Sequence, residues 1–290
     1  MGKEKSLSKT INKNNKRKIQ SKLKRKGNLT IYFLLRALVI ISMIGQGLNG
    51  NWNNVALCIL TLILFTLPNL ISSKFNIDLP EPLEIIVYLF IFSAEILGEI
   101  QNFYGIFEHW DTILHTLNGF LCAAIGFSLV DILNNNDEIH INMSPAFAAL
   151  VAFSFSMTVG VLWEFAEFTA DRYFLKDMQK DKIVEKFQSV KINPDGENVP
   201  IEVENIEKTE IYADNGNTVI IIDNGYLDIG INDTMKDLIV NFLGGTIFSI
   251  IGYLYFKNRE DNRFIEILIA RLRKQSKEEE VKVWKLKRKK

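Results

Sequence analysis

Acidic residues and a histidine recur in pairs at helical spacing within the apolar stretches of this sequence. The pairs are Asp111 and His115, Glu164 and Glu167, Asp233 and Asp237, and Glu95 and Glu99. Members of a pair stand three or four residues apart, so both side chains project from one face of a helix. Each pair could therefore place two ionisable groups together at one point of a helix bundle.

Carboxylates combined with one imidazole are suited to metal chemistry. Ionisable groups at membrane depth are costly and usually face an interior cavity. Several carboxylates cannot all stay charged there unless a cation is present. We therefore predict a divalent metal ion as cofactor, with its identity open among Mn, Mg, Fe and Zn. Its predicted ligands are Asp111, His115, Asp233 and Asp237.

Two glutamates could supply acid–base chemistry beside such an ion. Metal-bound water becomes a nucleophile when a carboxylate accepts its proton, and we assign this catalytic role to Glu164 and Glu167. Glu95 lies nearest the middle of its apolar stretch. Glu95 and Glu99 therefore form a second predicted site, for a proton or a cation.

The pairs Asp111/His115 and Glu164/Glu167 also have a simpler interpretation, as hydrated helix ends at the membrane surface. Asp233, which precedes Thr234 and an apolar run, suits the N-cap of a helix. His109 and His140 are interpreted as surface and loop residues. The functional interpretation of the pairs depends on their sharing one depth in the membrane.

The apolar stretches that carry these pairs are long enough to cross a membrane. Hydrophobic residues make up 48% of the 290-residue chain. Each stretch offers roughly 20 residues, which spans a hydrocarbon core of ~30 Å. The predicted spans are 31–49, 53–72, 83–103, 112–133, 146–169 and 237–256. The expected fold is an all-α membrane protein with a bundle of six transmembrane helices.

Basic segments flank these spans and set the expected orientation. Residues 1–28 hold eleven Lys/Arg and one Glu, and residues 257–290 hold thirteen Lys/Arg and six acids. The positive-inside rule places both segments in the cytoplasm of a multi-pass bacterial cell-membrane protein, which requires an even number of spans. We expect 1–28 to be a disordered arm and 257–290 an amphipathic tail, with helical spacing over 263–272. Both would contact membrane lipids, and no nucleic acid is expected as a partner.

Alternating helix directions bring the polar residues to one level. Helices 1–5 are expected within 29–171 and helix 6 within 233–256. With a rise of 1.5 Å per residue, Glu99, His115 and Glu164 all fall roughly 10 Å from the midplane, on the outer side. The sequence therefore predicts one shared site at the outer-leaflet end of helices 3–6.

Residues 172–232 form the one sizeable polar segment between predicted spans. It carries twelve acids against seven bases, and we expect an acidic, β-rich extracytoplasmic insertion. A short amphipathic helix is predicted over 176–191. The Asp-Asn-Gly triplets at 214–216 and 223–225 predict hairpin turns of a small β-meander, because Asn and Gly tolerate positive φ.

Three motifs together resemble a known family. They are Asp111-x-x-x-His115-x-x-x-Gly119, Glu164-x-x-Glu167, and Asp233-Thr234-x-x-Asp237 followed by Gly244. Over about residues 83–256 the chain resembles uncharacterised bacterial inner-membrane proteins of the YjdF type, although its 172–232 segment is longer than the link in that family. The resemblance implies a small helical bundle with acidic and His motifs near one surface. A looser similarity to VanZ-like membrane proteins suggests envelope biology by analogy.

Three functions remain open at the level of the sequence. The first is a metal-dependent hydrolase or modifying enzyme that acts on a lipid or envelope precursor. The second is an ion-coupled transporter that uses Glu95 and Glu99, and the third is a non-catalytic envelope anchor that binds a partner through 172–232. Nucleotide-binding, Ser-His-Asp and zinc-finger patterns are absent from the sequence. Neither a substrate nor an oligomeric state is indicated.

Overall fold

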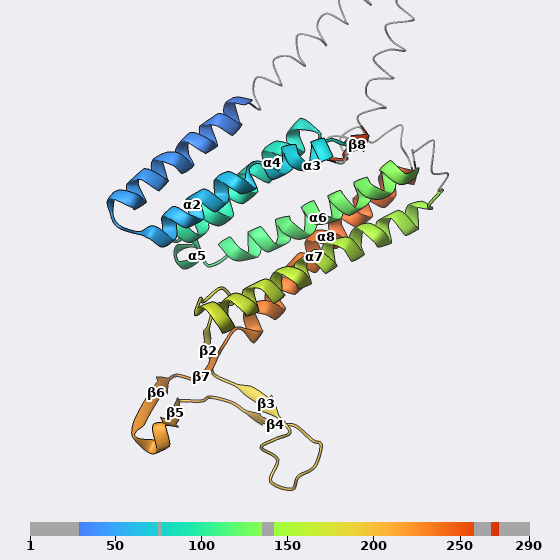
Figure 1. The fold of residues 1–290 in the computed structure, drawn as a ribbon. Coiled ribbons are helices and arrows are strands. Elements are labelled where there is room, and N and C mark those ends of the chain that lie inside the picture. Colours follow the sequence, from blue (N-terminus) through green and yellow to red (C-terminus); the bar gives the residue numbers. More distant parts are fainter. Residues whose placement is uncertain (1–28, 75–76, 135–141, 258–267, 273–290) are drawn as a thin grey trace, which may run out of the picture. The chain divides into compact units, whose positions relative to one another are not determined.

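The computed structural model describes residues 29–74, 77–134, 142–257 and 268–272, which are mostly helical (Figure 1). Among these residues, five helices are long and apolar enough to cross a membrane, and they coincide with five of the six predicted spans. Their bounds are Leu29–Leu48, Trp52–Lys74, Trp110–Asn134, Pro145–Phe174 and Ile231–Lys257. The arm 1–28 and most of the tail 257–290 lie outside the described residues, as does His140.

The stretch predicted as the third span is helical but not a single α-helix. α4 (Glu81–Phe92) begins directly after Pro80. The backbone of Pro80 is extended, so the helix does not start any earlier in the chain. It passes without a break into the π-helix η1 (Ser93–Ile100), and the short α5 (Phe103–Ile106) follows. Gly98 in η1 leaves room for the ring of Tyr104, which lies where a side chain would otherwise stand.

The second span is divided near its end. α2 (Trp52–Leu64) stops before α3 (Leu67–Lys74), and Pro68 is the second residue of α3. Proline is tolerated in the first turn of a helix because its missing N–H would have no intrahelical acceptor there. The two helices together still reach the length of one membrane span.

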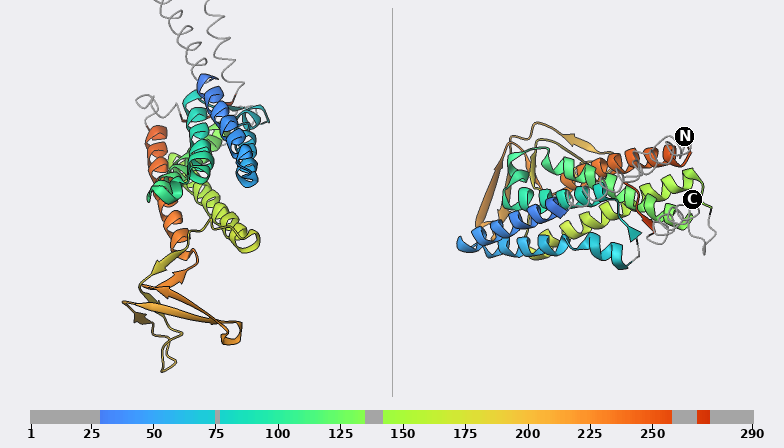
Figure 2. Two further views of the ribbon diagram at one scale, coloured as in Figure 1. Left: turned by 90° about the vertical axis from the view of Figure 1, so that its left-hand side faces the viewer. Right: turned by 90° about the horizontal axis from the view of Figure 1, so that it is seen from above.

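The chain divides into two compact units, one made of residues 1–157 with 241–290 and the other of residues 158–240. In the first unit, the first helix packs beside α2, α4 and η1 (Figure 2). Its Tyr32 ring lies 5.1 Å from that of Tyr88, and Phe65 contacts both rings. A second apolar cluster surrounds Phe127 and Phe248.

Within the first unit, α6 (Trp110–Asn134) runs parallel to the part of α8 (Ile231–Lys257) that begins at Asn241. Gly119 lies against the backbone carbonyl of Asn241, and further along the ring of Phe127 contacts that of Tyr255. A Cβ at Gly119 would collide with that carbonyl oxygen. Small residues at such points let two helix backbones approach closely.

The first part of α7 (Pro145–Phe174) runs antiparallel to α6 in the same unit. The Ser156 hydroxyl donates to the Gly119 carbonyl oxygen at 2.8 Å. Towards the other end, Gly126 lies against Ala152 and Phe155. These contacts fix the levels at which the two helices face each other.

The second unit contains the predicted β-rich insertion as three separate two-stranded antiparallel sheets. Their strand pairs are β2–β7, β3–β4 and β5–β6. The strand bounds are Lys182–Val184 (β2), Phe187–Ser189 (β3), Ile201–Val203 (β4), Lys208–Ala213 (β5), Thr218–Asp223 (β6) and Tyr226–Asp228 (β7). The first Asp-Asn-Gly triplet forms the turn between β5 and β6, as predicted.

Two local predictions for the insertion are wrong. Strands β2 and β3 replace the helix expected over 176–191. The expected meander does not form either, because β7 pairs with the distant β2 rather than with β6. At the second Asp-Asn-Gly triplet, Asn224 and Gly225 adopt positive φ and lead the chain away from the hairpin.

A short part of the C-terminal tail packs against other elements of the first unit. Residues 268–272 form a turn and strand β8 (Arg271–Leu272), which pairs with β1 (Ile77–Asp78), so the helix predicted over 263–272 is absent from this part. The backbone N–H of Ala270 donates to the Ser128 hydroxyl of α6 at 3.0 Å. Leu268, Ile269 and Ala270 are buried.

Candidate functional site

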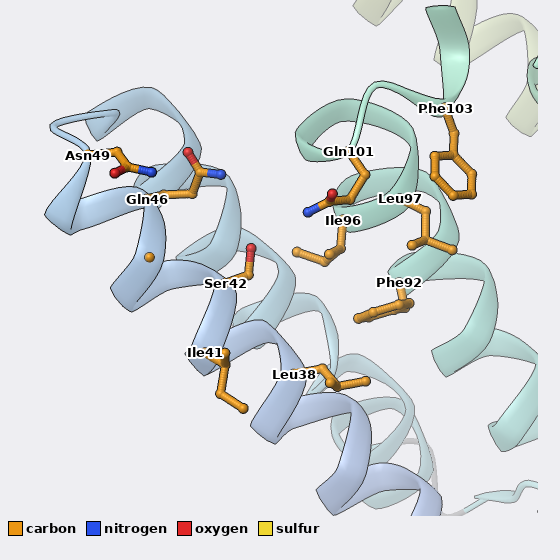
Figure 3. A pocket seen from close by; sticks show the side chains of 11 residues that line it. Leu38, Ile41, Ser42, Gln46, Asn49, Phe92, Ile96, Leu97, Gln101 and Phe103 are labelled. Atoms are coloured by element: carbon orange, nitrogen blue, oxygen red, sulfur yellow. The ribbon is translucent and has the colours of Figure 1, made fainter. Parts of the chain in front are cut away.

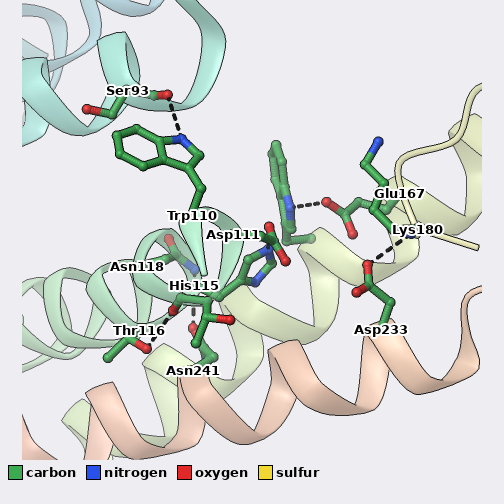
Figure 4. Close-up of polar contacts among 12 residues, drawn as sticks. Ser93, Trp110, Asp111, His115, Thr116, Asn118, Glu167, Lys180, Asp233 and Asn241 are labelled. Carbon is green, nitrogen blue, oxygen red and sulfur yellow. Dashed lines mark hydrogen bonds and ion pairs between the residues drawn. The ribbon is translucent and has the colours of Figure 1, made fainter. Parts of the chain in front are cut away.

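The site begins at the start of α6, which aromatic contacts hold in place. The Trp110 indole Nε1 donates to the Ser93 carbonyl oxygen at 3.3 Å, and its ring meets Phe103 edge to face at 5.0 Å. One residue on, Asp111 faces inward, and its Oδ1 lies 3.4 Å from Nε2 of His115 (Figure 4). The side chains of His115 and Asp111 are only 10% and 23% exposed. The predicted α-helical pair is thus formed.

A polar layer lies one turn below this pair and links three helices. Asn118 Nδ2 donates to Asn241 Oδ1 at 3.2 Å (Figure 4). Asn241 Nδ2 in turn donates to the Ser156 carbonyl oxygen at 3.4 Å, and Cys122 Sγ lies 3.5 Å from Asn118 Oδ1. Asn241 is fully buried. These contacts fix both amides and set the register of α6 and α8 beside the site.

Asp237 completes the group. It stands one helical turn before Asn241 on the continuous helix α8. One ligand atom from each of Asp111, His115 and Asp237 lies within 4.8 Å of the other two. His115 and Asp237 are buried, and Asp111 is half-buried. This group of two carboxylates and one imidazole could hold a metal ion.

The predicted catalytic glutamates lie on α7 in the second unit. Glu164 and Glu167 are both buried, at 4% and 7% exposure. The Trp163 indole Nε1 donates to Glu167 Oε1 at 2.7 Å, so one carboxylate oxygen is fixed by a residue one turn away. This hydrogen bond was not predicted from the sequence, although the four-residue spacing of Trp163 and Glu167 allows it on a helix.

Asp233 binds two residues of the segment that follows α7. Its Oδ2 accepts from the backbone N–H of Lys180 at 2.9 Å, and its Oδ1 pairs with Lys182 Nζ at 2.9 Å. It is not the N-cap considered above, since α8 begins at Ile231. Both oxygens of Asp233 therefore have protein donors, and metal ligation by Asp233 stays a prediction.

Glu95 and Glu99 both lie on η1, in the first unit. Glu95 is half-buried and Glu99 is exposed. A π-helix has hydrogen bonds from each residue to the fifth along, so one turn is slightly longer than four residues and the two side chains remain near one face. The two side chains differ in exposure, and their role as a proton or cation site stays a prediction.

Comparison with known proteins places this chain among membrane proteins. A family model described as "Predicted membrane protein (DUF2238)" matches residues 28–258, which include every site residue named above. The chain belongs to the DUF2238 family. With five candidate spans among the described residues, this DUF2238 protein is a multi-span membrane protein.

One relative of the DUF2238 protein comes from Thermotoga maritima and is itself described as uncharacterized. The two are 32% identical over 95 residues, which is 33% of this chain and 47% of the relative. The match thus spans about half of that protein's length. No solved structure matches the chain significantly.

Proposed function

We propose that this protein binds a divalent metal ion through Asp111, His115 and Asp237 and uses it to hydrolyse or modify a lipid or envelope precursor. The observation that carries the proposal is the approach of three ligand atoms to within 4.8 Å in a buried setting. A divalent ion would balance two carboxylates that are otherwise costly at this depth. Three protein ligands also leave coordination positions for water and substrate, as in catalytic metal sites.

The neighbouring glutamates suit the acid–base part of such a reaction. When bound, the ion would supply Lewis-acid chemistry and lower the pKa of water. Glu164 is buried on α7, at 4% exposure. A carboxylate shielded from bulk water in this way can accept a proton from a water molecule at the site.

Glu164 is therefore our candidate general base. Water would lose one proton to its carboxylate while the water oxygen bonds to the ester carbon or phosphorus. The bond to the leaving oxygen then breaks, and Glu164 returns the proton to that oxygen. Glu167, held by Trp163, would position the reacting groups from the next turn.

The proposal includes a membrane topology of six spans. α4 and η1 are contiguous from Glu81 to Ile100, which is long enough to act as the third span. With both basic flanking segments in the cytoplasm, the metal site lies in the outer leaflet and the insertion 172–232 outside the cell. We infer that YjdF-type relatives share the site, because the motifs that carry that resemblance contain its ligands.

Lipid conversion by the purified protein tests this function. The protein would be placed in liposomes of bacterial polar lipids with Zn²⁺ or Mn²⁺, and the lipids analysed by mass spectrometry over time. We expect a metal-dependent product that is lost in His115→Ala and in Glu164→Gln but kept in His109→Ala. His109 is exposed and six residues from His115, so it controls for the substitution itself. A product that is equally abundant in His115→Ala and His109→Ala would contradict the proposal.

An ion-coupled carrier is the second candidate, because Glu95 is half-buried on a π-helix, a form of backbone often found at functional sites. Proton-coupled uptake into vesicles would then vanish in Glu95→Gln and persist in Glu99→Gln, whose side chain is exposed. Uptake that is the same in both variants would reject this candidate.

A further inference from the structure

We propose that a groove between the first helix and α4–η1 binds one diacyl glycerophospholipid. The groove encloses about 480 Å³ and lies wholly within the first unit (Figure 3). Its walls are the face of Leu29–Leu48 that carries Leu38 and Gln46, and the face of α4–η1 that carries Phe92 and Ile96. This site goes beyond the proposed metal chemistry and does not depend on it.

The length of the groove matches one leaflet of a bilayer. Its lining begins at Leu38 on the first helix and ends at Asn49, eleven positions further along and just after the end of that helix. At 1.5 Å per residue this is roughly 16 Å, about half of a hydrocarbon core of ~30 Å. It therefore extends from the middle of the membrane to the boundary with the head groups, which is the length that an acyl chain occupies.

The polarity of the lining changes along that length (Figure 3). Asn49, Gln46 and Gln101 line the end where the helices terminate, whereas Leu38 and Phe92 line the deeper part. No lining residue is charged. The groove therefore suits a molecule with an apolar chain and uncharged polar groups next to that chain. In a bilayer, the ester groups of a glycerophospholipid have this position.

The orientation of Gln46 points to hydrogen-bond acceptors on the ligand. Its Oε1 accepts from Asn51 Nδ2 at 2.9 Å and from Asn54 Nδ2 at 3.1 Å. The oxygen is thereby held towards the loop, and the side-chain NH₂ remains as a donor. Ester carbonyl oxygens are acceptors only, so they complement this donor at the mouth of the groove.

The protein leaves space along the groove. A Cβ built at Gly45 would meet no atom within 4 Å, and Ile41 is 65% exposed. An acyl chain of a surrounding lipid would fill this space. The open position at Gly45 also provides a direct test, because a large side chain there would occupy the groove without striking the backbone.

Native mass spectrometry of the delipidated full-length protein tests the site. The probes are an ester-linked phosphatidylethanolamine and its ether-linked analogue, titrated against wild type, Gly45→Phe and Ile44→Phe. Ile44 is the matched control, since it is exposed on the same helix and does not line the groove. We expect wild type and Ile44→Phe to bind one ester lipid alike, and Gly45→Phe to bind it about tenfold more weakly.

The ester contact is tested by Gln46→Leu with the same pair of lipids. A hydrogen bond with a net value of about 1 kcal/mol predicts a several-fold preference of wild type for the ester over the ether lipid. Gln46→Leu should lose this preference while retaining the wild-type melting temperature to within a few degrees. Equal lipid binding by Gly45→Phe and Ile44→Phe would overturn the proposal. Equal affinity of the wild type for ester and ether lipids would overturn the assignment to a glycerophospholipid ester.

Discussion

Asn118 on α6 donates a hydrogen bond of 3.2 Å to Asn241 on α8, deep inside the helix bundle. The same Asn241 amide donates to the Ser156 carbonyl oxygen on α7. One helical turn from this contact, α6 carries His115 and α8 carries Asp237. The two asparagines therefore hold the helices in the register that the proposed metal ligands require.

Replacing Asn241 with Leu should disturb both stability and the site. The variant removes the acceptor of the half-buried Asn118 amide, and a hydrogen bond of this kind contributes about 0.5–1.5 kcal/mol. Loss of the helix register that these contacts set should also weaken metal binding. Denaturation in detergent and metal titration measure the two effects. Leu243→Ala is the control, because Leu243 is 50% exposed on the same helix. Metal affinity that is unchanged in Asn241→Leu would argue against this positioning role.

Gly119→Ala should separate α6 from α8. The new methyl group would collide with the Asn241 carbonyl, a backbone atom that cannot move aside alone. Overpacking of this kind costs about 1–3 kcal/mol, so the melting temperature in detergent should fall. At Gly47 the nearest atom lies 3.8 Å from an added Cβ, so Gly47→Ala provides the control and should unfold like wild type. Equal melting temperatures for the two variants would show that the close approach is unimportant.

The long-range contacts explain why the sequence predicted this site only in part. The lengths of the apolar stretches predicted the spans, because a hydrocarbon core demands about 20 apolar residues. The four-residue spacing predicted that Asp111 and His115 share a helix face. The Asn118–Asn241 bond was not predictable, since its partners are 123 residues apart and nothing local specifies their pairing.

Predictions of secondary structure were wrong where the local sequence pattern was weak. The strands β2 and β3 have three residues each, too few to show an alternating pattern reliably. Their sequences fit a helix equally well, and pairing of β2 with the distant β7 decides the outcome. The π-helix was missed because apolar composition alone does not distinguish it from an α-helix.

Lys182→Met should loosen the insertion while sparing metal binding. The variant removes the 2.9 Å ion pair with Asp233 but leaves the Lys180 N–H on the other oxygen. Because Lys182 is 41% exposed, the change in global stability should be about 1 kcal/mol or less. Limited proteolysis within 172–232 should be faster. Lys186→Met should digest like wild type, since Lys186 is 65% exposed and its carboxylate contacts are 3.8–3.9 Å long. Loss of metal in Asp233→Asn would instead support Asp233 as a ligand.

Trp163→Phe should lower turnover and leave metal content intact. Phenylalanine keeps an aromatic ring but lacks the indole N–H that bonds to Glu167 Oε1 at 2.7 Å. A hydrogen bond contributes about 0.5–1.5 kcal/mol, so we expect a several-fold fall in the rate of lipid conversion. Trp52→Phe, at a residue that is 72% exposed, should have the wild-type rate. A loss of bound metal in Trp163→Phe would contradict the view that Trp163 acts only by positioning Glu167.

The most direct test of the metal site is elemental analysis of detergent-purified protein by mass spectrometry. The protein would be prepared without chelator, incubated with Zn²⁺, Mn²⁺ and Mg²⁺, and freed of unbound ions by gel filtration. Wild type and His109→Ala should each retain about one divalent ion per chain, because imidazole and carboxylate ligands act together. His115→Ala and Asp237→Asn should retain little. Folded wild-type protein without metal, or a His115→Ala variant with the wild-type amount, would contradict a metal site at Asp111, His115 and Asp237.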